Sequence, residues 1–206
     1  MDLGRAMSLP RVYVIVESAA RLERLLPAGV RLVQLRVKDR SPEEVRREVV
    51  AARALCARWN AQLIVNDYWQ VALDENCDFV HLGQGDLESA DVPMLRRSGV
   101  RLGVSTHDEA ELERALSLNP DYVALGPIYP TLLKVMPWAP QGLTRVGEWK
   151  RRIGARPLVA IGGLTVERLA GVFAAGADVA AVVTDIVRHA TPEARAREWL
   201  VAADRR

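Results

Sequence analysis

Eight short apolar segments, most of them followed by a stretch of helical character, dominate the sequence. Each is rich in Val, Ile and Leu, and several alternate between apolar and polar residues as strands do. The predicted strands cover residues 12–16, 31–37, 62–65, 79–82, 101–105, 122–125, 158–161 and 179–183. A repeated strand–helix order predicts parallel strands, because each helix returns the chain to the same edge of the sheet.

Helical stretches fill much of the sequence between these strands. The clearest covers 42–60, where Ser41 is placed to cap the N-terminus, Pro42 takes the first helical position and Glu44 completes a capping box. Further helices are predicted at 108–118 and 166–175, and 86–100 holds at most a short helix at 93–97.

Eight strands with intervening helices in 206 residues predict a (β/α)₈ TIM barrel, an α/β fold. We expect one catalytic domain over residues 1–206, with a flexible N-terminus at about 1–10. An open doubly wound sheet is the alternative, but it has one ligand crevice at a switch point. Here polar residues follow most of the predicted strands, which favours the barrel.

Composition excludes several classes of protein. Half of the residues are apolar and the formal net charge is only +2, which excludes a disordered chain. The arginines are scattered, so no nucleic-acid partner is expected. The N-terminus has no signal-like apolar run and no segment is long enough for a membrane span. The two cysteines fit free thiols, so a cytoplasmic enzyme without a membrane partner is expected, with a homo-oligomer left open.

Gln34, Arg36 and Lys38 alternate with apolar residues along one predicted strand and therefore share a face. Two cations and an amide on an interior strand are costly to bury unless an anion meets them. A salt-bridge layer inside the barrel is the alternative, but it needs carboxylates nearby. Arg and Lys are the usual partners of phosphate, so the pattern predicts an anion site.

Acidic side chains follow the next two strands. Asn66 and Asp67 end one, and Asp86 follows the other. Each could be an ordinary turn residue. Because the ends of parallel strands meet at one face, we expect the two carboxylates to lie together, which suits Mg²⁺ with water and phosphate as its other ligands.

Two loops complete the predicted site. Gly162 and Gly163 follow the seventh strand and allow close approach of a ligand to backbone amides, while Thr165 is placed to cap the next helix. Barrels often bind phosphate after strands seven and eight. The proline-rich loop at 126–142 carries Lys134, for which the residues alone leave two readings open, a contact to an anion in the site or an ordinary solvated loop lysine.

In order along the chain, these motifs resemble those of the thiamine phosphate synthase (thiamine-phosphate pyrophosphorylase) family. The matching segments are 34–38, 65–67, 81–86, 103–107, 125–131, 141–143, 160–163 and 182–184, together with Lys134. The resemblance covers nearly the whole chain. It implies a transferase of thiamine biosynthesis that couples 4-amino-2-methyl-5-(diphosphooxymethyl)pyrimidine to 4-methyl-5-(2-phosphoethyl)thiazole or its carboxylated form, with Mg²⁺ as cofactor.

The resemblance also implies roles for particular residues. The pyrimidine diphosphate is expected to contact Gln34, Arg36, Lys38, Asn66, Ser105 and Lys134. Of these, Arg36, Lys38, Ser105 and Lys134 are the expected catalytic residues, and Asp67 and Asp86 are the expected metal ligands. The thiazole phosphate is expected to contact Thr131, Leu133, Gly162, Gly163, Val183 and Thr184.

The sequence departs from the family pattern at three positions. Leu133 stands where a second Thr is usual, Gly85 where an acid is usual, and Thr184 where Ser is more common. A related barrel of the thiazole tautomerase or regulatory type is the alternative function. It has no need of a diphosphate–Mg²⁺ site, so the cations and the two aspartates argue against it. A sugar-phosphate isomerase would need a placed acid–base pair, for which the sequence offers no strong candidate.

Overall fold

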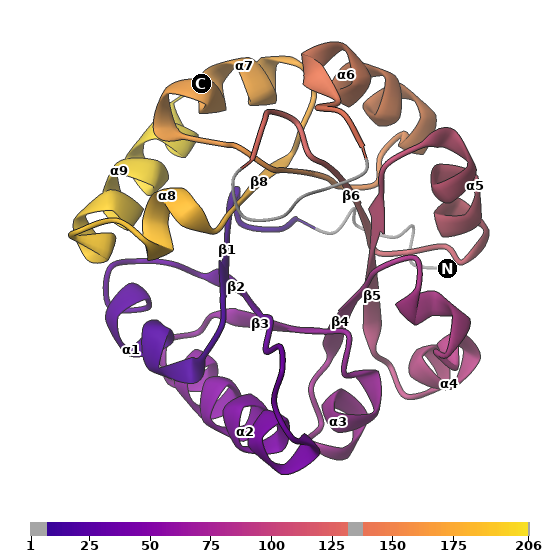
Figure 1. The fold of residues 1–206 in the computed structure, drawn as a ribbon, viewed down its shortest axis with the longest axis vertical. Coiled ribbons are helices and arrows are strands. Elements are labelled where there is room, and N and C mark those ends of the chain that lie inside the picture. Colours follow the sequence, from indigo (N-terminus) through magenta and orange to yellow (C-terminus); the bar gives the residue numbers. More distant parts are fainter. Residues whose placement is uncertain (1–7, 132–137, 206) are drawn as a thin grey trace.

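The computed structural model describes residues 8–131 and 138–205, and in them eight parallel strands close into a barrel. Each strand pairs with its neighbours in sequence, and β8 pairs with β1 (Figure 1). The strands are β1 (Val12–Val16), β2 (Leu32–Leu35), β3 (Gln62–Asn66), β4 (Phe79–Leu82), β5 (Arg101–Thr106), β6 (Tyr122–Leu125), β7 (Leu158–Ile161) and β8 (Val179–Val182). The predicted TIM barrel is confirmed.

Helices surround the strand ring. The α-helices are α1 (Leu22–Leu25), α2 (Pro42–Arg58), α3 (Trp69–Asp74), α4 (Val92–Arg97), α5 (Glu109–Ser117), α6 (Gly142–Ile153), α7 (Leu169–Ala174), α8 (Thr184–Val187) and α9 (Pro192–Asp204). Short 3₁₀ turns are η1 (Ala19–Arg21), η2 (Asp86–Glu88) and η3 (Val166–Arg168). The helix predicted at 166–175 is therefore a 3₁₀ turn followed by α7. None of the described helices is long and apolar enough to cross a membrane.

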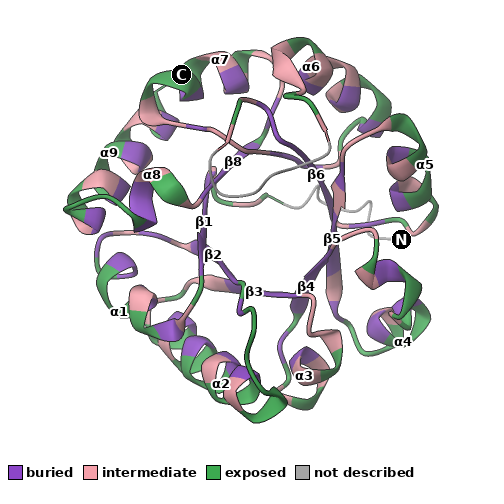
Figure 2. Cartoon of the chain, viewed as in Figure 1, coloured by how far each residue is buried: buried purple, intermediate pink, exposed green. Residues whose placement is uncertain are grey.

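The apolar core has two layers, which follow from side-chain alternation along the strands. On β1, Val12, Val14 and Val16 pack outward against the helices, whereas Tyr13 and Ile15 point into the barrel. The inner layer is therefore a packed interior, and Figure 2 shows the inner ring as mostly buried. Because side chains fill the interior of the barrel, a ligand can enter at the C-terminal ends of the strands.

The strands predicted at 31–37 and 179–183 are both shorter in the structure, and the first differs more. β2 ends at Leu35, so Arg36 and Lys38 follow the strand and do not lie on it. The alternation nevertheless continues, because Val37 is buried whereas Arg36 and Lys38 are exposed. The predicted strand range 31–37 is therefore too long at its C-terminal end, whereas the face shared by Arg36 and Lys38 lines the cavity. Both cations are exposed at the mouth of the barrel.

Candidate active site

A cavity of about 1030 Å³ opens at the C-terminal ends of the strands. It brings together every candidate side chain that lies within the described residues. These are Gln34, Arg36, Lys38, Asn66, Asp67, Asp86, Ser105, Thr131, Gly162, Gly163, Val183 and Thr184. The remaining candidates, Leu133 and Lys134, lie outside the described residues.

The two aspartates lie close enough to influence each other. Asp67 follows β3 in a left-handed conformation (φ 64°), and its carboxylate forms an ion pair with the Lys38 ammonium group. Burial, and then the neighbouring Asp67 charge, raise the pKa of Asp86, while Lys38 acts in the opposite direction. A shared cation would relieve this repulsion between the two carboxylates.

The donor set fits Mg²⁺ more closely than a metal held entirely by protein. No group of three or more His, Cys, Asp or Glu side chains that could hold a metal is found in the described part of the chain. Mg²⁺ commonly uses one or two carboxylates and takes its remaining ligands from water and phosphate oxygens. Asp67 and Asp86 provide those two carboxylates.

Asn66 supplies an unpaired donor at the same wall of the cavity. Its side chain is buried, and its Nδ2 has no hydrogen-bond partner among the described residues. A buried donor without a partner is costly, by about 1–3 kcal/mol. An acceptor oxygen or nitrogen of a bound ligand would satisfy it, which supports the prediction that Asn66 contacts a substrate.

A chain of hydrogen bonds crosses the floor of the cavity. Gln34 Nε2 donates to the Tyr13 hydroxyl (2.8 Å), which lies 3.0 Å from the hydroxyl of Tyr122. His81 joins the chain through Nδ1, 2.7 Å from the Tyr122 oxygen, and through Nε2, 2.7 Å from Ser105 Oγ. Burial lowers the pKa of His81 to about 4 and raises the pKa values of both tyrosines, so these three groups are neutral near pH 7.

The glycine pair after β7 is needed for packing as well as for conformation. Gly163 has a φ of 65°, and a Cβ there would lie 2.5 Å from the Pro130 carbonyl oxygen. A Cβ on Gly162 would lie 2.6 Å from the Cα of Pro127. The loops after β6 and β7 therefore touch directly, and any side chain at either glycine would push them apart.

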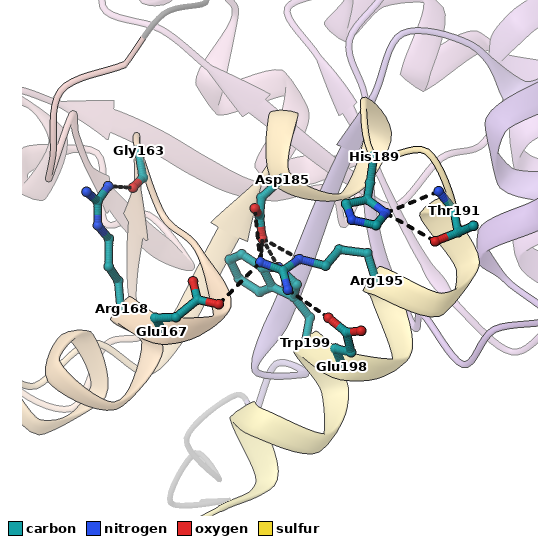
Figure 3. Close-up of polar contacts among 9 residues, drawn as sticks. All are labelled: Gly163, Glu167, Arg168, Asp185, His189, Thr191, Arg195, Glu198 and Trp199. Atoms are coloured by element: carbon teal, nitrogen blue, oxygen red, sulfur yellow. Dashed lines mark hydrogen bonds and ion pairs between the residues drawn. The ribbon is translucent and has the colours of Figure 1, made fainter.

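Figure 3 shows a polar cluster that holds the next loops in place, and the sequence pattern did not predict it. Asp185, in α8, accepts hydrogen bonds from Arg195 Nε (3.0 Å) and Trp199 Nε1 (2.7 Å), both on α9. Arg168 donates to the carbonyl of Gly163 and lies over the Tyr129 ring, 4.3 Å from its centroid. The cluster ties the loops after β7 and β8 to the outer helices.

Three other details differ from expectation or add to it. Thr165 takes the N-cap position of η3, but its side chain makes no capping hydrogen bond. Arg168 and Arg188 also line the cavity, and no predicted motif included them. Their position shortly after the β7 and β8 loops is a signal that could have identified them. Trp138 stacks on the His107 ring at a centroid distance of 3.9 Å, as part of the cavity wall.

Comparison with known proteins identifies the family of this chain. The family model described as thiamine monophosphate synthase matches residues 12–186. A curated thiamine-phosphate synthase from Rhizobium etli is 59% identical over 196 residues, covering 95% of this chain and 96% of its own. A second, from Klebsiella pneumoniae, is 47% identical over 193 residues, covering 94% and 88%.

A solved structure has the same fold. Thiamine phosphate pyrophosphorylase from Pyrococcus furiosus superposes with a TM-score of 0.84, covering 95% of this chain and 96% of that one, at 22% identity. That likeness concerns the fold alone. The family model and the sequence relatives carry the assignment, and this chain belongs to the thiamine-phosphate synthase family.

Proposed function

We propose that this chain is an alkyltransferase that couples an aminopyrimidine methyl diphosphate to a thiazole phosphate, giving thiamine phosphate and diphosphate. The observation that carries the proposal is one cavity with two differently built ends. Arg36, Lys38 and an acidic pair gather at one end, and the β7 and β8 loops with Gly163 and Thr184 form the other. Two phosphorylated substrates fit such a divided site.

The diphosphate end is built to stabilise a leaving group. The carbon–oxygen bond of the pyrimidine methyl group breaks, and its electron pair leaves with the diphosphate. Arg36 and Lys38 lie at the cavity mouth as fixed positive charges, an arrangement that stabilises developing negative charge. Asp67 and Asp86 would hold Mg²⁺, which supplies further positive charge to the phosphate oxygens when bound.

The coupling step needs no general base. The thiazole nitrogen uses its lone pair to form the new carbon–nitrogen bond, and it has no proton to lose. The neutral, hydrogen-bonded state of His81 agrees with this chemistry, because no histidine of the cavity floor has to accept a proton. Thr131, Gly163, Val183 and Thr184 are the proposed contacts of the thiazole phosphate, which keeps its nitrogen toward the pyrimidine.

A coupling assay with both substrates tests this function. Purified protein is incubated with and without Mg²⁺, and thiamine phosphate and diphosphate are measured together. Both products should appear in equal amounts and only with Mg²⁺. A protein that binds thiazole phosphate yet forms neither product would support the tautomerase-like alternative.

Arg36→Ala and Arg40→Ala form a matched pair for the diphosphate end. Arg36 lines the cavity, whereas Arg40 is exposed in the same loop, with Nη1 3.5 Å from Glu44 Oε1 and outside the cavity lining. Losing a charged hydrogen-bond partner costs about 1.5–3 kcal/mol, so Arg36→Ala should slow coupling by roughly 10- to 100-fold. It should also weaken diphosphate binding in calorimetry. Equal effects of the two substitutions would contradict the assignment.

A further inference from the structure

Three buried residues with no role in the proposed chemistry connect two of the proposed substrate contacts. Tyr13, Tyr122 and His81 lie between Gln34 and Ser105 in one unbroken hydrogen-bond chain. The members come from five different strands, β1, β2, β4, β5 and β6, so the barrel interior is organised around them. Both ends of the chain line the cavity.

The hydrogen-bond chain needs a glycine at position 103 to leave room for the Tyr122 ring. Gly103 pairs with Tyr122 across β5 and β6, and a Cβ at Gly103 would lie 2.1 Å from the Tyr122 ring. The Tyr122 ring also stacks near His81, with centroids 5.6 Å apart and an interplanar angle of 14°. Gly103 therefore leaves the space that the Tyr122 ring occupies in the hydrogen-bond chain.

Counting hydrogens gives the chain a direction. Gln34 Nε2 can only donate, so the Tyr13 oxygen accepts. Within the described residues the Tyr13 hydroxyl hydrogen then has the Tyr122 oxygen as its acceptor, and Tyr122 in turn donates to His81 Nδ1. The reverse order, with Nδ1 protonated, requires the Gln34 amide to turn over so that Oε1 accepts from Tyr13, because in the observed orientation the buried Tyr13 hydrogen would have no partner.

The direction fixes what each end offers to a ligand. In this direction the His81 proton lies on Nε2, which donates to Ser105 Oγ at 2.7 Å, and the Ser105 hydroxyl keeps its own hydrogen for the cavity. At the other end, the amide nitrogen of Gln34 donates to the Tyr13 hydroxyl. Its oxygen, Oε1, is therefore the group that can accept a hydrogen bond from a ligand. The cavity floor thus presents an acceptor at Gln34 and a donor at Ser105.

We propose that Tyr13, Tyr122 and His81 are positioning residues that set Gln34 as an acceptor and Ser105 as a donor, and thereby select an amino-substituted pyrimidine over its oxo analogue. The inference rests on the proposed function. An amino group donates to Gln34 Oε1, whereas a ring carbonyl at the same position places an acceptor against an acceptor. Sites that hydrogen-bond a substrate group reject analogues that lack it strongly, because buried polar groups are left unpaired.

The first experiment reads the direction without any substrate. ¹⁵N NMR of histidine-labelled protein reports which ring nitrogen carries the proton, and the chain has only three histidines. His107→Gln and His189→Gln identify the His81 signals by elimination. We expect His81 to be protonated on Nε2 alone, and Tyr122→Phe to introduce the Nδ1-protonated form. A parent protein with His81 protonated on Nδ1 would have the opposite order and would overturn the inference.

The second experiment reads selectivity. The ratio of kcat/KM for the 4-amino substrate to that for the 4-oxo analogue is measured in the parent and in Tyr13→Phe, which frees the Gln34 amide to rotate. The ratio should fall by about tenfold, the worth of one hydrogen bond. Phe79→Leu is the matched control, since Phe79 packs on Tyr122 (centroids 5.6 Å apart) without taking part in a hydrogen bond of the chain.

The outcomes separate this inference from the proposed function. Phe79→Leu should lower both kcat/KM values together and leave the ratio unchanged. A ratio that is equally unchanged in Tyr13→Phe would show that Tyr13 has a packing role only. A parent protein that makes no thiamine phosphate would refute the proposed function, and the NMR result would still decide the direction of the chain.

Discussion

Asp67 and Asp86 repel each other in the structure, and the same closeness makes them suitable ligands for a shared metal ion. Asp67 and Asp86 are placed near each other at neighbouring strand ends, and the charge of one raises the pKa of the other. Lys38 compensates in part through its ion pair with Asp67. Such an arrangement is typical of a functional site, where repulsion between the charged groups is relieved by a bound ion.

Replacing either acid should affect metal-dependent activity far more than folding. Asp67→Asn and Asp86→Asn should each lower the coupling rate by roughly 100-fold, since metal-ion catalysis is worth several kcal/mol. Calorimetry with Mg²⁺ and diphosphate should show weakened binding. Urea unfolding should show little loss of stability, because each substitution removes a repelling charge and no core contact, and the Lys38 ion pair that Asp67→Asn also weakens is partly exposed.

Asp39→Asn is the control for this prediction. Asp39 is exposed in the loop that carries Lys38, it does not line the cavity, and its left-handed conformation (φ 55°) is one that Asn accepts. It changes the charge by the same amount outside the site. Unaltered Mg²⁺ dependence in both site variants would remove the basis for the metal assignment.

At the scale of elements, the start of α2 is set by a few neighbouring residues. Ser41 Oγ accepts from the Glu44 backbone N–H (3.3 Å), and the Glu44 carboxylate accepts from the Ser41 N–H (2.9 Å). Both bonds satisfy backbone donors that a helix start leaves unpaired. The capping box was predicted from the sequence, and it is confirmed.

Removing this cap should lower stability and leave the active site unchanged. Ser41→Ala should reduce the free energy of unfolding by about 1 kcal/mol, the usual worth of an N-cap side chain. Ser18→Ala is the matched control, because Ser18 holds the N-cap position of η1 without a side-chain capping bond. Urea titrations of both variants decide the point. A loss of equal size in the control would mean that the hydroxyl of Ser41 contributes nothing as a cap.

At the scale of the whole molecule, folding buries both cysteine thiols and keeps them from reacting. Cys56 and Cys77 are buried in the outer core layer, and burial raises their pKa values to about 12 and about 11. Thiolate, and not thiol, is the reactive form, so both should be inert at pH 8 while the barrel is folded. Both belong to the same contiguous core and should become accessible together when it opens.

Thiol labelling in increasing urea should therefore follow global unfolding. We expect no modification of the native protein at pH 8, and labelling of both cysteines at the transition seen by tryptophan fluorescence, since two of the five tryptophans, Trp149 and Trp199, are buried in the core. Cys77→Ala separates the two signals. Rapid modification of Cys56 in the folded variant would show that the outer layer opens locally.

Local sequence determined the elements of this protein. Strand alternation and the capping box act over a few neighbouring residues, so the ranges 12–16, 79–82 and 122–125 match the observed strands. The same information placed most candidate residues at strand ends, because parallel strands all end at one face. The predicted strand at 31–37 ran past Leu35, where β2 ends. The alternation of apolar and polar residues continues into the loop, so it does not show where the sheet stops.

Only the tertiary structure decided which polar groups meet. Gln34, Tyr13, Tyr122, His81 and Ser105 lie on five strands, and their contacts depend on barrel closure and strand register. No local pattern encodes a contact between Tyr13 and Tyr122, which are 109 positions apart. The strands follow from local propensity and periodicity, whereas the direction of the hydrogen-bond chain follows from packing across the closed barrel.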